Sequence, residues 1–477
     1  MSKYRFSPLS IVLLSCTLYL PLLNNFFWSD DWYFLWISRI SSINEFLQFF
    51  SFGNNPHTTP MYRPLSTQAF FFMFQNLFGL HAGPYYLFSI IIWAVGLFVL
   101  YLVLHHIVKK NNVALLMSTL YAFSASHFAR LSYLSAFQEI LMFATGITAI
   151  YFICFKKRTM IGIVTFIAAL LSKESAIVLP GLMIAIEIYK GEKLFTRENV
   201  KKYLPIFFFS VAYMYLRFIA KDWTDLGSGN YAWNFSPLRA IHTTVWYGLW
   251  SIGLPELVIH YVGNNASILP RFWIDFPLMS RILSASFLFF IGTLSCAKLS
   301  WLTSNIKNKK QWRLMFLGLA WFIIGLLPIV FLPDHKYVLG QSLALVGMSI
   351  LLALIISGSQ KYLGKIAFGS YILLNLVSIM FLYQTHVSLQ RSEIAKRTYS
   401  YFVQKYTEPP IGIYFKNDKQ IQVAQWGQSR QIHHAVGEYF FSVLYKKKYS
   451  NVVYEDDLNG RLVPKDWEVV PSSLFID

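Results

Sequence analysis

Long apolar stretches, separated by short polar segments, recur along most of the chain. A helix of about 20 apolar residues crosses a hydrocarbon core of roughly 30 Å, so each stretch of that length predicts a membrane-spanning helix. The pattern predicts an all-α polytopic membrane protein with about eleven such helices. Their expected ranges are 9–27, 84–105, 113–126, 135–155, 159–172, 175–189, 203–219, 278–298, 314–332, 338–357 and 362–384.

Three of the expected helices are short. The ranges 113–126, 159–172 and 175–189 hold only about 14 or 15 residues each, or near 21 Å at 1.5 Å per residue. Helices of this length do not cross the hydrocarbon core completely. Their outer ends should therefore lie below the headgroups, in a recess that a lipid headgroup can reach from the side.

The composition agrees with a membrane protein. Of the 477 residues, 55% are hydrophobic and 13% are charged, whereas charged residues make up about a quarter of an ordinary soluble domain. The first apolar run follows Lys3 and Arg5, but no small-x-small cleavage site follows it, so we expect a retained helix and not a signal peptide. Cys16, Cys154 and Cys296 lie within apolar runs without metal-ligand spacing, so no disulfide or zinc site is expected.

The net charge of +18 lies mostly in the loops of one side. If the N-terminus is cytoplasmic, the loops on that side carry the lysines and arginines that the positive-inside rule requires. These are Lys109, Lys110, Lys156, Lys157, Arg158, Lys190, Lys193, Arg197, Lys201, Lys202, Lys307, Lys309, Lys310, Arg313, Lys361 and Lys365. The basic charge therefore indicates orientation in a cell membrane, the inner or plasma membrane, and no nucleic-acid partner is expected.

Three segments are expected on the extracytoplasmic side. Two are large outer loops, 28–83 and 220–277. The apolar stretch 239–260 within the second loop should be interfacial or re-entrant, because counting it as a span would move the next basic cluster outward. The third segment is the tail 386–477, whose runs IGIYF and NVVYE flank an amphipathic stretch and predict a small α/β domain. Residues 1–385 form the predicted transmembrane catalytic domain.

Two adjacent carboxylates, Asp30 and Asp31, stand just after the first apolar run, in the stretch FFWSDDWYFLW. Aromatic rings such as those of Trp28, Trp32 and Trp36 favour the interface between membrane and water. An acid pair at that depth is costly unless it binds a ligand or transfers a proton. We therefore favour a functional pair over solvated loop charges.

Most other unusual polar residues fall on the same side under this topology. They are Tyr62 and Arg63 in MYRPLS, His127 and Arg130 in SHFAR, Glu139, Lys173 and Glu174 in LLSKESAIVLP, and His335, Lys336 and Tyr337 in DHKYVLG. Several also have a structural reading: Lys173 with Glu174 as a turn pair, Arg63 as a ligand of backbone carbonyls or lipid phosphate, His127 and Glu139 as helix-packing polar groups, and Tyr337 as a structural residue. Their coincidence on one face favours a substrate site.

These residue types suit a group transfer to a hydroxyl. A carboxylate beside an apolar wall and a second carboxylate can have a raised pKa and act as a general base near neutral pH. Guanidinium, ammonium and imidazole groups suit a phosphate or pyrophosphate, which arginine can bind bidentately. A polyprenyl-phosphate sugar fits, because its tail stays in lipid while its sugar bond reaches the recess. The chain has no Gly-rich phosphate loop, so no nucleotide is expected.

The order of these motifs over residues 1–385 resembles the GT-C superfamily of polyprenyl-phosphate-sugar glycosyltransferases, closest to its protein O-mannosyltransferase and TMTC-like branch. The resemblance implies a catalytic acid in the first outer loop, followed by substrate-binding polar residues, with a hexose donor that is mannose in that branch. The positions that match are Asp30 and Asp31 for the acid, and Arg63, His127, Glu139, Lys173 and Glu174 for the polar residues.

Three hypotheses follow. The first is a multi-pass membrane glycosyltransferase that moves a sugar from a polyprenyl-phosphate donor to a hydroxyl of a protein, lipid or glycan on the extracytoplasmic face. The second is a polytopic transporter or lipid-carrier flippase, a class that usually shows internal repeats, and the third is a non-catalytic assembly partner. A divalent metal at Asp30 and Asp31 is left open, because two carboxylates alone are a weak metal signature.

Overall fold

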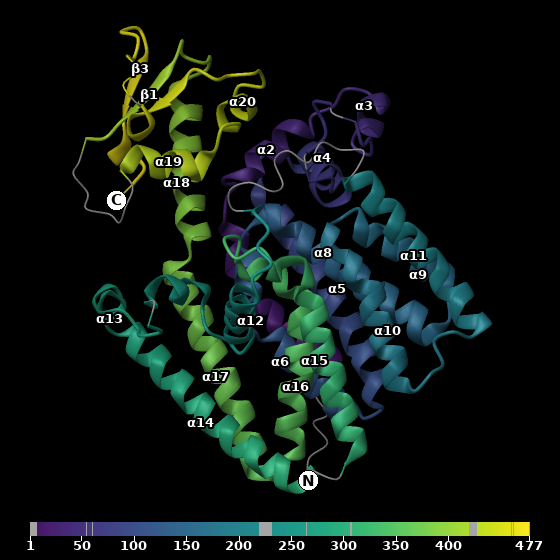
Figure 1. Ribbon diagram of the computed structural model, residues 1–477. Coiled ribbons are helices and arrows are strands. Elements are labelled where there is room, and N and C mark those ends of the chain that lie inside the picture. Colours follow the sequence, from purple (N-terminus) through teal and green to yellow (C-terminus); the bar gives the residue numbers. More distant parts are fainter. Residues whose placement is uncertain are drawn as a thin grey trace.

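The computed structural model describes the whole chain except residues 1–6, 54, 60, 219–230, 264, 306–307, 419–426, 459, 461 and 477. Over the described residues the membrane part is helical, and a small parallel sheet stands beyond one end of the helix bundle (Figure 1). The expectation of a largely helical polytopic membrane protein with a small C-terminal α/β part is confirmed.

The described elements follow one another in two groups. Those before the second large loop are α1 (Pro8–Thr17), α2 (Asp30–Ile37), α3 (Ile43–Gln48), α4 (Phe70–Phe78), α5 (Ala82–Val108), α6 (Asn111–Ala122), α7 (His127–Leu131), α8 (Phe137–Ile150), α9 (Thr159–Leu170), α10 (Leu179–Lys190) and α11 (Arg197–Phe218). Those after its start are α12 (Pro237–Ser251), α13 (Pro270–Asp275), α14 (Met279–Asn305), α15 (Lys309–Val330), α16 (Ser342–Gly358), α17 (Lys361–Thr385), α18 (Val387–Lys405), β1 (Ile413–Lys416), α19 (Gln428–Val436), α20 (Phe440–Leu444), β2 (Val452–Tyr454) and β3 (Glu468–Pro471).

Six helical segments of the described chain are long and apolar enough to cross a membrane, and they contain α5, α8, α14, α15, α16 and α17. Of the other predicted spans, 203–219 lies in α11, a continuous helix of 22 residues up to Phe218, and the rest are shorter or interrupted. The predicted span 9–27 is divided into α1 and a 3₁₀ turn over Leu20–Asn24 that contains Pro21, a residue without a backbone donor. The helices α6, α9 and α10 each have 12 residues, so the three helices expected to be short are indeed short.

Glycines allow α15 and α16 to approach closely. A Cβ atom added to Gly347 would meet the backbone nitrogen of Phe322, and one added to Gly325 would lie 2.6 Å from the backbone nitrogen of Ala344. Between membrane helices, such close backbone approach gains van der Waals contact where lipid offers no hydrophobic drive to associate. The contact fixes the two helices that flank the segment 331–341.

The two ends of the bundle differ in what they carry. In Figure 1, α2, α3 and α4 lie at the same end as the C-terminal sheet, while the end of α14 and the start of α15 lie at the opposite end. Lys309 and Lys310 begin α15 at that opposite end, and Lys361 begins α17, which runs from there toward the sheet. These three lysines and the acid pair are therefore at opposite ends of the bundle.

One nearly continuous helix leads from the bundle to the C-terminal part. α17 ends at Thr385, His386 has extended backbone (φ −72°, ψ 130°), and α18 begins at Val387. The domain boundary predicted after residue 385 lies at this helix break and stays a prediction. Beyond α18, three parallel strands are arranged in the order β2-β1-β3 in the described residues, and Phe415 of β1 stacks on Tyr454 of β2 with ring centroids 5.1 Å apart.

The C-terminal part packs against α2. The backbone N–H of Ser29 donates to the carbonyl of Ala435 at 2.7 Å, and Nη2 of Arg39 donates to the carbonyl of Val443 at 2.7 Å. Ser29 itself has a φ of 51°, a conformation that favours glycine. The position of α2 is therefore held from the C-terminal part as well as from the bundle.

Candidate active site

Asp31 is fully buried in the first turn of α2. One carboxylate oxygen accepts the backbone N–H of Trp28 at 3.1 Å, and the other accepts both the backbone N–H of Ser135, at 2.7 Å, and its hydroxyl. Burial raises the pKa of Asp31 to about 7, against the effect of these three donors. Because both oxygens are bonded within the protein, Asp31 joins α2 to the segment 132–136 and has no exposed surface.

Asp30, one residue earlier, is exposed. The hydroxyl of Tyr133 donates to Oδ2 of Asp30 at 2.8 Å and accepts the backbone N–H of Asp30 at 3.3 Å. The Tyr133 ring packs on Trp28 with centroids 4.1 Å apart. Burial and the nearby aspartates raise the pKa of Tyr133 well above its ordinary value, so the phenol remains a donor. Asp30 is thus a carboxylate that Tyr133 orients and that remains open to solvent.

Arg63, from the first outer loop, forms a two-point ion pair with Glu174. Nε of Arg63 donates to Oε2 of Glu174 at 2.7 Å, Nη2 donates to Oε1, and Nη1 donates to Gln138. Burial alone would raise the pKa of Glu174, but the charge and hydrogen bonds of Arg63, with the charge of Lys173, bring it to about 2. The pair is therefore ionised at neutral pH, and all three guanidinium nitrogens have protein partners.

Lys173 pairs with a different acid from the one beside it in sequence. Its ammonium group donates to Glu139 of α8. Glu139 is fully buried, and its other oxygen accepts the hydroxyl of Ser342 at 3.1 Å. The structure thus replaces the alternative of a Lys173–Glu174 turn pair by two separate ion pairs. This second pair ties α8, the start of α16 and the connection between α9 and α10 together.

The segment between α15 and α16 brings His335 and Tyr337 to these ion pairs. The His335 ring lies 4.2 Å from that of Tyr231 and 4.8 Å from that of Tyr337, between centroids. Burial and the charges of Lys173 and Arg63 lower the pKa of His335 to about 4. The imidazole is therefore neutral at pH 7 and offers a hydrogen bond, not a positive charge.

Tyr231 connects the acid pair with the ion pairs. It interacts electrostatically with Arg63 and Glu174, and also with Asp30 and Tyr337. Burial is the main cause that raises the pKa of Tyr231. Residues from the first outer loop, the connection before α10 and the segment before α16 therefore belong to one region.

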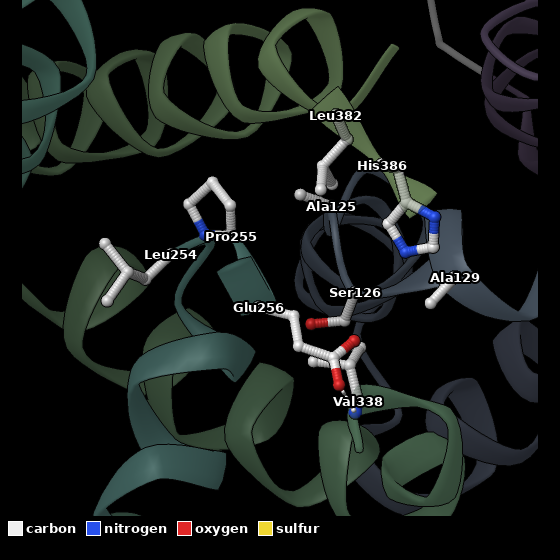
Figure 2. A pocket seen from close by; sticks show the side chains of 9 residues that line it. All are labelled: Ala125, Ser126, Ala129, Leu254, Pro255, Glu256, Val338, Leu382 and His386. Atoms are coloured by element: carbon white, nitrogen blue, oxygen red, sulfur yellow. Dashed lines mark hydrogen bonds between the residues drawn. The ribbon is translucent and has the colours of Figure 1, made fainter. Parts of the chain in front are cut away.

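The backbone of Val338 is held from two sides. Nη2 of Arg130 donates to its carbonyl at 3.3 Å, and a carboxylate oxygen of Glu256 accepts its N–H at 3.2 Å. Figure 2 shows the Glu256 carboxyl group directed toward Val338, beside Ser126. Burial raises the pKa of Glu256 to about 7, although the Val338 N–H opposes the rise. These two contacts fix the segment that precedes α16.

His127 and Arg130 are fully buried inside the bundle. Nε2 of His127 lies 2.7 Å from the carbonyl oxygen of Tyr121, and Nδ1 lies 3.2 Å from Nη1 of Arg130. Since arginine can only donate, Nδ1 accepts and Nε2 carries the proton. These contacts fit the helix-packing alternative considered for His127, and Arg130 contacts the segment before α16 through the Val338 carbonyl.

Tyr62 and Lys336, also predicted to bind substrate, contact residues outside the two ion pairs. The hydroxyl of Tyr62 donates to the carbonyl of Phe50 at 2.9 Å, so it orders the outer loop. Lys336 interacts with Asp334 and Arg239, and burial is the main cause that lowers its pKa. Arg239 belongs to α12, so the structure places Lys336 on the α12 side of the segment and not beside the acid pair.

The hydrogen bonds of the acid pair bear on the open question of a divalent cation. Both oxygens of Asp31 accept hydrogen bonds from Trp28 and Ser135, and Asp30 accepts one from Tyr133. The buried Asp31 therefore serves its protein donors, and a cation at this place would be held mainly by the exposed Asp30. In the part of the chain that the structure describes, no group of three or more His, Cys, Asp or Glu side chains could hold a metal ion.

Two arginines of the region were not predicted. Arg217, near the end of α11, interacts electrostatically with Glu174, and Arg391 of α18 interacts with Asp30. Arg217 is a charge near the outer end of the predicted span 203–219, which is a signal that could have identified it. Arg391 lies in a tail of mixed charge, where no such signal exists.

Comparisons with known proteins give weak structural similarity to two solved structures. No protein-family model and no curated protein matches the chain. Among solved structures, the chain is similar to ArnT from Cupriavidus metallidurans in the apo state, at 13% identity and a TM-score of 0.39, over 97% of this chain and 88% of that chain. It is also similar to ArnT from the same organism bound to undecaprenyl phosphate, at 14% identity and a TM-score of 0.36, over 98% and 89% of the two chains. At TM-scores below 0.5, neither likeness establishes a shared family or function.

Proposed function

We propose that the protein is an integral-membrane glycosyltransferase that moves a sugar from a polyprenyl-phosphate donor to a hydroxyl acceptor. The observation that carries the proposal is an exposed carboxylate, Asp30, in the same region as the cations Arg63, Lys173 and Arg217. A base beside a cationic cluster suits a reaction in which a hydroxyl loses a proton and a phosphate departs.

Asp30 accepts the proton of the acceptor hydroxyl. The hydroxyl oxygen attacks the anomeric carbon of the donor sugar and forms the new glycosidic bond. The bond between that carbon and the phosphate oxygen breaks, and its electron pair leaves with the phosphate, so the carrier is released as polyprenyl phosphate. Direct displacement of this kind inverts the configuration at the anomeric carbon.

The cationic cluster stabilises the departing phosphate. Arg63, Lys173 and Arg217 carry three positive charges, and Glu139 and Glu174 carry two negative charges, so one positive charge remains. The ion pairs hold these groups in place before the reaction, which is the arrangement that makes electrostatic stabilisation effective.

We place the active site on the extracytoplasmic face of the cell membrane. The support is the positive-inside rule, because the basic loops and the acid pair lie at opposite ends of the bundle. The strands and helices described within 386–477 stand at the same end as α2, which carries the acid pair (Figure 1), and would share its compartment. The motif resemblance makes a hexose, with mannose first, and a protein hydroxyl the first substrates to test, followed by lipid and glycan hydroxyls.

The test is transfer by the purified full chain in liposomes that contain a labelled polyprenyl-phosphate sugar. Asp30→Asn keeps an oxygen for the Tyr133 hydroxyl and removes the base, so kcat should fall by about 10²–10⁴-fold. Asp275→Asn is the control, because Asp275 forms a partly exposed ion pair with Arg271 on α13. A transfer rate of Asp30→Asn equal to that of the control would refute the assignment of Asp30 as the base. Carrier translocation without any glycosylated product would favour the flippase alternative instead.

A further inference from the structure

Three aromatic rings meet where the second outer loop approaches the connection between α15 and α16. The His335 ring lies 4.2 Å from the Tyr231 ring and 4.8 Å from the Tyr337 ring, measured between centroids. The ring planes are inclined by 32° in the first pair and by 75° in the second. Tyr231, His335 and Tyr337 therefore form one group from two segments, which we call the aromatic cluster.

Backbone contacts hold the two segments of the aromatic cluster together. The N–H of Asn234 donates to the carbonyl of Phe331 at 2.9 Å. The ring of the next residue, Phe235, lies 5.1 Å from the Phe331 ring. From α12, the hydroxyl of Tyr247 donates to the Tyr337 carbonyl at 3.2 Å. The rings of the cluster are therefore positioned by the segments that carry them.

The segment before α16 also lies against one of the two ion pairs. A Cβ atom added to Gly340 would lie 3.8 Å from Oε1 of Glu139, the oxygen that accepts the Lys173 ammonium group. The other oxygen of Glu139 accepts the hydroxyl of Ser342 at 3.1 Å. The part of the cluster that comes from this segment is therefore fixed beside the cationic cluster.

The aromatic cluster faces both halves of the proposed reaction. His335 interacts electrostatically with Arg63 and Lys173. Tyr231 interacts with Arg63 on the cationic side and with Asp30, the proposed base, on the other. The cluster therefore lies in the region between the group that takes the proton and the groups that stabilise the phosphate.

The polar atoms of the three rings are available to a ligand. Tyr337 is 43% exposed, and Tyr231 and His335 are partly exposed. In the part of the chain that the structure describes, the two phenol hydroxyls and both ring nitrogens of His335 have no hydrogen-bond partner. Because the pKa of His335 is lowered to about 4, its imidazole is neutral at pH 7 and offers one donor and one acceptor.

We propose that the aromatic cluster is the subsite for the sugar of the donor, a pyranose ring. This inference rests on the proposed function, in which the anomeric carbon must lie between Asp30 and the phosphate. One face of a pyranose ring presents C–H groups, which pack on an aromatic ring. Its hydroxyls both donate and accept, as phenol hydroxyls and a neutral imidazole do. Tyr231, His335 and Tyr337 therefore offer the apolar face and the hydrogen bonds that a sugar requires.

The first experiment measures binding to the full chain in detergent by native mass spectrometry. The probes are farnesyl phosphate and farnesyl phosphate that carries mannose, glucose or galactose, and the measured quantity is the ratio of their affinities. The wild type should bind at least one sugar-bearing probe about tenfold more tightly than farnesyl phosphate. Tyr231→Leu, which removes the ring, should reduce that ratio about fivefold, and Tyr231→Phe, which keeps the ring, should reduce it less.

Tyr362→Leu is the matched control for this ratio. Tyr362 is 78% exposed at the start of α17, at the opposite end of the bundle from α2, so the variant should keep the wild-type ratio. If Tyr231→Leu weakens farnesyl phosphate and the sugar-bearing probe equally, the ring serves the tail or the phosphate and the proposal is overturned. A wild-type ratio near one for all three sugars overturns it as well.

A second measurement uses the wild-type chain and does not depend on how a variant folds. Hydroxyl radicals modify accessible tyrosine rings, and mass spectrometry locates the modified peptides. The sugar-bearing probe should protect Tyr231 and Tyr337 more than farnesyl phosphate does, while modification of Tyr362 stays unchanged. Equal protection of Tyr231 and Tyr337 by the two probes contradicts a sugar subsite.

Transfer kinetics separate this inference from the proposed function. In the liposome assay, Tyr231→Leu should raise KM for the donor about fivefold and leave inhibition by farnesyl phosphate unchanged. If the wild type transfers sugar and Tyr231→Leu keeps the wild-type donor KM, the inference fails and the glycosyltransferase stands. If the wild type transfers no sugar from any polyprenyl-phosphate donor, the proposed function fails and the inference fails with it.

Discussion

Glu174→Gln tests whether an ion pair fixes the cationic side of the site. Nε and Nη2 of Arg63 donate to the two carboxylate oxygens of Glu174. The Arg63 side chain is only 9% exposed, whereas that of Glu174 is 35% exposed. Glutamine offers one acceptor oxygen in place of two, and its amide NH2 group, a donor, faces the guanidinium. The substitution therefore leaves a nearly buried positive charge without its carboxylate.

The size of the effect follows from the pKa of Glu174. Burial would raise this pKa, but Arg63 and Lys173 bring it from an ordinary value of 4.5 to about 2. At about 1.4 kcal/mol per pH unit, the difference corresponds to about 3 kcal/mol. Because Glu174 is 35% exposed, solvent screens the pair, and we expect about half of that, ~1.5 kcal/mol. Since the pKa is lowered in the folded chain, this stability is present above about pH 4.5 and is lost as the pH falls toward 2.

The assay is thermal unfolding of the purified full chain in detergent at one fixed scan rate. A loss of ~1.5 kcal/mol should lower the apparent Tm by about 3–6 °C, from the response of domains of 150–250 residues. Glu198→Gln is the matched control, because Glu198 and Lys157 are 3.4 Å apart with side chains 78% and 82% exposed, and its Tm should change by less than about 1 °C. The difference between wild type and Glu174→Gln should narrow as the pH is lowered toward 3. An apparent Tm of Glu174→Gln equal to that of Glu198→Gln at pH 7 would refute the reasoning.

Two further substitutions test burial and packing by the same unfolding assay. Glu256→Gln keeps an oxygen for the Val338 N–H and removes a carboxyl whose pKa burial raises from 4.5 to about 7. A raised acid pKa makes the wild type less stable as the pH rises from about 4.5 to 7. Glu256→Gln should therefore have a higher apparent Tm than the wild type at pH 8 and a nearly equal one at pH 5. A lower apparent Tm of the variant at pH 8 would contradict the raised pKa. Gly347→Ala puts a methyl group against the backbone of Phe322 and should cost about 1–3 kcal/mol. Gly292→Ala is the control, because its added Cβ meets nothing within 4 Å, and it should keep or raise the apparent Tm. Equal apparent Tm values for the two glycine variants would argue against close packing of α15 on α16.

The positions of the long helices could be predicted because lipid imposes a strict condition. A backbone in hydrocarbon must bond its own N–H and C=O groups, which favours a helix wherever about 20 apolar residues follow one another. The predicted span 338–357 accordingly lies within the helical segment Val338–Gly358, and 278–298 lies within α14 except for its first residue. The span 9–27 fails this test because α1 ends at Thr17, four residues before Pro21, which has no backbone N–H to bond the Thr17 carbonyl. Hydropathy therefore places the elements, but proline alone does not set the breaks, because Pro205 and Pro328 lie inside α11 and α15.

The partners of the charged residues could not be predicted in the same way. Lys173 has an extended backbone, with φ −163° and ψ 140°, and successive side chains of an extended chain point to opposite sides. Lys173 therefore reaches Glu139, while Glu174 reaches Arg63, 111 positions away. The partner of each charged residue depends on how the helices pack against one another. The residues next to a charged residue in the sequence do not specify that packing.

The tail was expected to be a separate domain, and this expectation concealed Arg391. A single extended residue, His386, separates α17 from α18, so the first helix of the tail continues from the bundle and stays beside it. The hydrogen bonds of Ser388 and Ser392 to the segments around the acid pair follow from that continuity. A composition change marks where a chain becomes more polar, and it does not mark where contacts with the preceding helices end.

The two neighbouring aspartates differ because they begin a helix. Consecutive residues of an α-helix point about 100° apart, so Asp31 turns into the protein toward Ser135 while Asp30 turns toward Tyr133 and solvent. A base must reach the hydroxyl of an acceptor, and of the two aspartates Asp30 is the exposed one. Asp31 binds the segment that carries Tyr133, and Tyr133 in turn orients the carboxylate of Asp30. The buried acid therefore determines where the exposed acid stands, which under the proposed function makes Asp30 the base and Asp31 its support.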